Sequence, residues 1–152
     1  MRSAVSVALV LALLFSLSPF PGWTAVAERL PPANEVSVLD AYWGKPGAKV
    51  EAGPGDRSMP LTVAVINARK EALVSLVGEL LLDRAPLSPS DGGSGAFAYS
   101  SVPLRSGEIT YLTFELDVDP RAVPGDYELY VWLSYQYVNA RGEFETGRSL
   151  ER

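Results

Sequence analysis

The sequence predicts an all-β protein: an immunoglobulin-like antiparallel β-sandwich of about seven strands, preceded by an N-terminal signal peptide or hydrophobic helix. Beyond residue 35, apolar side chains recur at every second position, the period of a strand with one buried face. Turns rich in proline and glycine separate these stretches, and no long segment has the apolar period of an α-helix. We therefore expect a signal peptide over 1–27, a linker over 28–34 and one sandwich domain over 35–152.

The first 27 residues have the pattern of a secretory signal peptide. Arg2 supplies a positive charge, residues 4–15 are apolar, and Ala25 and Ala27 form a small-residue cleavage site before Glu28. The apolar run is shorter than the roughly 20 residues that span a bilayer. An uncleaved N-terminal anchor is the alternative, and it would be the only contact with a membrane. Both interpretations predict export by the general secretory route to the cell envelope or the extracellular space.

The first half of the domain predicts three strands. One runs from Val36 to Gly44, and another covers 61–67 after a Pro/Gly-rich loop that holds a brief edge strand near Val50. Residues 73–83 are ambiguous, because their leucines fit one face of a helix whereas their valines and Gly78 favour a strand. We prefer a strand there, since strand signals surround it.

The second half continues the same pattern after a flexible loop over 86–95. Further strands are expected over 97–102, 112–118 and 127–137, and a hairpin turn over 139–142 leads into a C-terminal strand that begins near Phe144. In the long strand over 127–137, the odd-numbered residues are expected to share one face, with Glu128, Tyr130 and Trp132 on the opposite face.

Composition removes most catalytic chemistry. The chain has no cysteine and no histidine, which excludes a thiolate nucleophile, a serine–histidine relay, a disulfide, and thiolate or imidazole ligands for zinc or iron. Thirteen basic and 18 acidic residues give a net charge of −5, which argues against nucleic-acid binding. We expect a protein that is not an enzyme and that has no cofactor.

Several short motifs carry a family resemblance. The segments Ala41-Tyr42-Trp43-Gly44, Gly53-Pro54-Gly55-Asp56 and Leu61–Asn67, and in the second half Arg105–Glu108, Leu112–Leu116 and Gly125–Leu129, occur in this order. In this respect the chain resembles the archaeal S-layer-type β-sandwich domains, relatives of the cell-adhesion-related CARDB modules. The resemblance spans about 36–137 and implies an envelope-exposed module for adhesion, spacing or surface assembly. It brings no catalytic residues.

Three residues of these motifs are expected to have structural roles. Trp43, beside Gly44, is expected to pack at the end of a sheet. Tyr127 follows the Gly125-Asp126 corner, where sandwiches of this class place a tyrosine whose hydroxyl satisfies a backbone group of the preceding loop.

With histidine absent, carboxylates are the candidates for metal binding or acid–base chemistry. Asp117, Asp119 and Asp126 flank one corner and could supply oxygen ligands to calcium, although aspartates beside proline and glycine are ordinary turn formers. Glu115 and Glu128 are the one pair that could approach the spacing of a glycosidase. We favour solvated corner carboxylates in both cases.

Aromatic residues on the outward face provide a candidate binding surface. Tyr130 and Trp132 fall on the face opposite Leu129, Val131 and Leu133, and Tyr111 lies outward on a strand that could neighbour theirs. Such rings can stack sugars or form the centre of a protein interface. The alternative, which we favour because sandwiches also bury large aromatic residues, assigns the faces the other way, with Trp132 as the core tryptophan.

The C-terminal strand is mostly charged and scarcely alternates. Either it is a short charged edge that discourages pairing, which we favour, or it is an open edge that accepts a strand from another subunit. Together these features predict an exported surface module that contacts other envelope proteins. The alternative function is a soluble carbohydrate-binding module.

Overall fold

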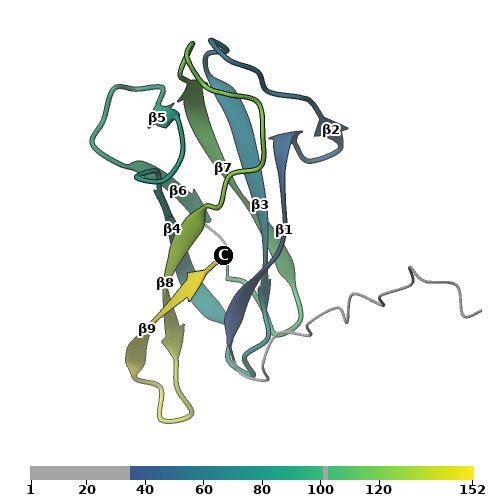
Figure 1. Ribbon diagram of the computed structural model, residues 1–152. Coiled ribbons are helices and arrows are strands. Elements are labelled where there is room, and N and C mark those ends of the chain that lie inside the picture. The colour runs from purple at the N-terminus through teal and green to yellow at the C-terminus, as the bar shows by residue number, and fades with distance from the viewer. Residues whose placement is uncertain (1–34, 101–102) are drawn as a thin grey trace, which may run out of the picture.

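The computed structural model describes residues 35–100 and 103–152, and this part of the chain is all β (Figure 1). Its strands are β1 (Val36–Lys45), β2 (Ala48–Lys49), β3 (Met59–Asn67), β4 (Leu73–Leu81), β5 (Leu87–Pro89), β6 (Ala96–Ser100), β7 (Ile109–Val118), β8 (Tyr130–Val138) and β9 (Phe144–Glu151). The expected signal peptide with its site at Ala25 and Ala27, and the expected linker, lie outside the described residues.

Two antiparallel sheets face each other across one core (Figure 1). The first has the strand order β2-β1-β3-β7-β5, and the second has the order β6-β4-β8-β9. The all-β prediction is confirmed, and so is the strand over 73–83, which forms β4 and pairs with both β6 and β8. The short strands β2 and β5 raise the number above the expected seven.

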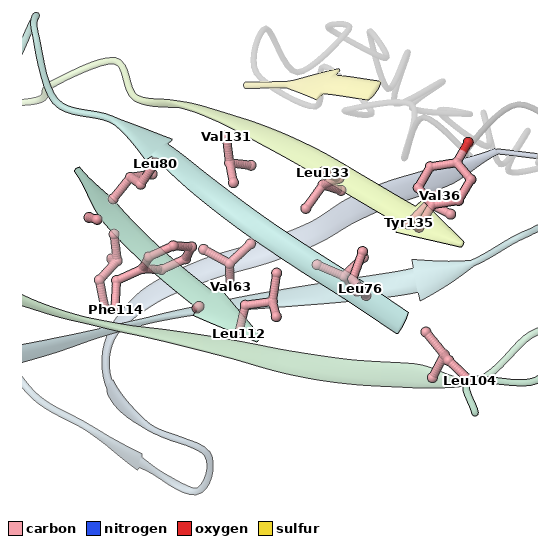
Figure 2. Packing of buried hydrophobic residues seen from close by; sticks show 14 of the residues in the cluster. Val36, Val63, Leu76, Leu80, Leu104, Leu112, Phe114, Val131, Leu133 and Tyr135 are labelled. Carbon is pink, nitrogen blue, oxygen red and sulfur yellow. The ribbon is translucent and has the colours of Figure 1, made fainter. Parts of the chain in front are cut away.

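The core consists of residues that alternate along the central strands. Leu112, Phe114 and Leu116 of β7 are almost fully buried, as is Leu133 of β8 in the other sheet. Figure 2 shows side chains from both sheets converging on the same space. Burying a leucine or phenylalanine stabilises the fold by about 1.5–3 kcal/mol, so this alternation is the main stabilising pattern of the domain.

Two expectations about the strands are wrong. The loop expected over 86–95 contains the short strand β5, because Leu87–Pro89 pairs with the end of β7. The long strand was predicted from Tyr127, but β8 begins at Tyr130, and residues 127–129 form an irregular segment before it. Within β8 the odd-numbered residues face inward: Val131, Leu133 and Tyr135 are buried, while Tyr130 and Trp132 lie on the other side, so the favoured interpretation that Trp132 belongs to the core is wrong.

Polar contacts join the two sheets at their sides. The Ser100 and Thr110 hydroxyls lie 3.0 Å apart, between β6 and β7. On the opposite side, the Ser149 hydroxyl of β9 donates to the Val36 carbonyl of β1 at 3.0 Å. The C-terminal strand is thus paired with β8 along its whole length and reaches β1 through side chains.

Gly44 allows β1 to turn into β2. Its φ of 109° lies in the region that favours glycine. A Cβ atom there would meet the backbone oxygen of Ala48 at 2.1 Å. Its carbonyl also accepts a 2.6 Å hydrogen bond from the hydroxyl of buried Thr62, which anchors the turn to β3.

Replacing Gly44 with alanine is expected to lower the free energy of unfolding by about 2 kcal/mol or more, through both backbone strain and the clash with Ala48. Gly47→Ala is the matched control, because Gly47 also has a positive φ but no atom near its missing Cβ. Gly47→Ala should lower the free energy of unfolding by about 1 kcal/mol. Urea denaturation measures both, and equal losses would show that the clash has no effect.

Candidate functional site

The outer face of the four-stranded sheet carries two rows of side chains in direct cross-strand register. Phe97, Glu79, Trp132 and Leu150 form one row across β6, β4, β8 and β9. Tyr99, Val77, Ser134 and Arg148 form the next row. Because directly opposite residues in an antiparallel pair share one side of the sheet, these eight side chains lie on one surface.

The large apolar side chains on this surface are open to solvent. Tyr99 is 72% exposed, Phe97 48% and Leu150 46%, and Trp132 and Tyr130 are half-buried. We call these five residues the outer aromatic face. Exposed apolar residues that occur singly are normal, whereas this group occupies three of the four strands on one face of the sheet, β6, β8 and β9.

Arg148 connects the two rows. Its guanidinium lies 4.1 Å from the centroid of the Trp132 ring and 3.3 Å from the Glu79 carboxylate. The ion pair is half-exposed, so its own contribution to stability is small. Its effect is to hold the tryptophan ring in one orientation and to neutralise the charge at the centre of the face.

Of the three candidate surface residues, the structure places Tyr130 and Trp132 on this face and Tyr111 elsewhere. Trp132 lies outward, so the interpretation that we favoured from the sequence, in which it is the core tryptophan, is wrong. Tyr111 is 49% exposed, but it lies on β7 of the other sheet, so its strand does not neighbour that of Tyr130 and Trp132.

Phe97, Tyr99 and Leu150 were not recognised as surface residues from the sequence. The signal was the pattern Ala96-Phe97-Ala98-Tyr99, in which the small residues are the buried ones. The usual preference for large apolar residues in the core gives the wrong face here. For Leu150, the charged neighbours concealed the alternation of β9.

The candidate calcium ligands Asp117, Asp119 and Asp126 do not come together as a metal site. Asp117 accepts hydrogen bonds from the Ser58 N–H and the Ser90 hydroxyl, both at 2.8 Å, and these lower its pKa. Asp119 accepts from the Arg121 N–H at 2.7 Å, as turn aspartates do. Within 35–100 and 103–152, no three acidic residues, Asp126 included, gather in a way that could hold a metal ion.

Glu115 and Glu128 are also separated. Glu115 lies on β7 of the first sheet, whereas Glu128 precedes β8 of the second and pairs with Arg152.

The three structural candidates lie at one end of the sandwich. Trp43 packs against the core cluster beside the Gly44 turn. The Tyr127 hydroxyl donates to the Val123 carbonyl at 2.5 Å, which is the expected bond to the preceding loop.

No family model, no curated protein and no solved structure matches this chain. In the described part of the chain, no helix is long and apolar enough to cross a membrane.

The turn between β8 and β9 holds the main charged network. The Glu145 carboxylate accepts hydrogen bonds from the Tyr137 hydroxyl at 2.5 Å and from Asn139 Nδ2 at 2.6 Å. These two bonds, the one from Tyr137 foremost, lower the pKa of Glu145 below its usual 4.5. The Arg69 guanidinium lies 3.9 Å from the centroid of the Tyr137 ring.

Because the pKa of Glu145 is lower in the folded state, its stabilising effect is present above about pH 4.5 and is lost as the pH falls through the folded value. Glu145→Gln should therefore flatten the acid side of the stability profile, measured by urea denaturation from neutral to acidic pH. Glu115→Gln, which removes a carboxylate outside this network, is the control. A Glu145→Gln profile as steep as that of the wild type would contradict this assignment.

Proposed function

We propose that this protein is an exported, non-enzymatic module of the cell envelope that acts in adhesion, spacing or surface assembly through protein–protein contacts. The observation that carries the proposal is the outer aromatic face, five large apolar residues on three of the four strands of one sheet. Export rests on the leader pattern of residues 1–27.

The strand order supports the immunoglobulin-like class as the finer fold. One sheet contains β1-β3-β7 and the other β4-β8-β9, which correspond to the A-B-E and C-F-G groupings of that class. The Tyr127 hydroxyl bond agrees with the same class. We extend this to the archaeal S-layer-type and CARDB-like modules on the motif order of the sequence, which implies a surface-exposed role.

A protein partner fits this surface better than a glycan does. Tyrosine, tryptophan and arginine are the residues that dominate binding energy at protein interfaces, and here they lie together on one face with the charge of Glu79 paired. The Arg148 guanidinium already lies over the Trp132 ring, where a stacked sugar would otherwise lie. Carbohydrate binding therefore remains the second candidate.

The test is site-specific photo-crosslinking in cells that make the full chain. A photoreactive residue at Tyr99 should give one discrete adduct in the envelope or extracellular fraction, and Trp132→Ala should abolish it. The matched control is the same photoreactive residue at Tyr111, an exposed tyrosine of the other sheet.

Equal adducts from positions 99 and 111, or a Tyr99 adduct that survives Trp132→Ala, would contradict the proposed interface. A product found only in the cytosol with residues 1–27 still attached would contradict export.

A further inference from the structure

The sandwich is open on one side, between β1 and the start of β8. Ala41 pairs directly with Val63, a core residue of β3, so its side chain points between the sheets. It is nevertheless exposed, so within 35–100 and 103–152 no side chain covers the core at this point.

Two hollows occupy the opening. One, of about 710 Å³, lies between Leu61 and Val63 of the first sheet and Leu80 and Val131 of the second. Figure 2 shows Val63, Leu80 and Val131 directed into the same interior space. The other, of about 520 Å³, continues past Trp43 and beneath the 122–125 corner.

The hollows share Ala41, Leu61, Asp126, Tyr127 and Leu129, and we call them together the lateral groove.

The backbone along the groove is a free strand edge. At the start of β1, side chains of β9 cover this edge: Ser149 bonds the Val36 carbonyl, and the Glu151 carboxylate accepts from the Val38 N–H. At the far end, the Trp43 carbonyl accepts from the Val50 N–H.

Between these points, the described strands give β1 no partner except β3. Because the bonding direction alternates along an antiparallel strand, the N–H and C=O of Ala41 point to the same outer side as the Trp43 carbonyl.

The charge of the residues that line the groove also indicates which kind of ligand would bind there. Asp126 lies where the two hollows meet and forms no ion pair with any described residue, whereas neighbouring Glu128 is paired with Arg152. The chain as a whole carries a net charge of −5. An unpaired carboxylate in a groove of an acidic protein favours a basic ligand.

We propose that the lateral groove binds an extended, basic peptide segment, which adds as a strand along the outer edge of β1. A strand supplies the N–H and C=O partners that the edge at Ala41 requires. Its alternate side chains, if aliphatic, enter the space between the sheets, and a lysine or arginine meets Asp126. This site lies between the sheets, so it is separate from the outer aromatic face.

Cysteine labelling tests the proposal, because the natural chain has no cysteine. Ala41→Cys reports on the groove, and Ala140→Cys, exposed in the turn after β8, is the matched control. The probe is a short synthetic peptide of alternating valine and threonine with one central lysine. Saturating peptide should slow maleimide labelling at position 41 and leave position 140 unchanged.

Asp126→Asn should raise the half-saturating peptide concentration about twofold to fivefold, the range for one partly exposed ion pair. The same peptide with N-methylated amides should give no protection, because it cannot pair with the strand edge. Ala52→Cys, at the other end of the groove, repeats the measurement if Ala41→Cys fails to fold.

Unchanged labelling at position 41 with millimolar peptide, or equal protection by the N-methylated peptide, would overturn the proposal. Without peptide, slow labelling that speeds up on dilution would assign the groove to a second copy of the chain. Slow labelling at every dilution would assign it to another segment of the same chain. Either result would overturn the peptide as occupant.

Discussion

The packing of two sheets against each other, through alternate residues of β4, β7 and β8, is the constraint on which the other features depend. Leu76, Phe114 and Leu133 occupy the space between the sheets. Because successive strand residues point to opposite sides, burying Leu133 places Trp132 on the outside. The outer aromatic face is therefore a direct consequence of how the core is filled.

The same packing explains the lateral groove. Each sheet buries one face, and on the β1 side the described strands of the two sheets are joined near Val36 and Val38, where Ser149 and Glu151 of β9 bond the backbone of β1. Farther along β1, Ala41 is too small to fill the space opposite Val131, and the irregular segment 127–129 replaces a strand. Two surfaces of different character result, a broad aromatic face and a narrow apolar opening with a free backbone edge. We propose that they bind two different partners, one folded and one extended.

Much of the fold could be predicted because single-faced strands such as β7 alternate strictly, with Leu112, Phe114 and Leu116 all inward. The same rule separated the two faces of β8 but could not decide which face is buried, because sandwich cores accept large aromatic residues as well as leucine and valine, and the favoured core position of Trp132 was wrong. The prediction failed where pairing between distant strands decides the outcome: no local pattern shows that Tyr111 and Trp132 belong to different sheets. The groove was also beyond sequence reasoning, because Ala41 looks like an ordinary strand residue until its partner strands are known.

A comparison of two leucine-to-alanine variants on opposite faces tests the central claim most directly. Leu133 is fully buried and Leu150 is 46% exposed, and each is replaced by the same smaller side chain. Urea denaturation should show a loss of about 2–5 kcal/mol for Leu133→Ala and less than about 1 kcal/mol for Leu150→Ala. Equal losses, or a larger loss for Leu150→Ala, would contradict the assignment of the two faces and with it the proposed contact surface.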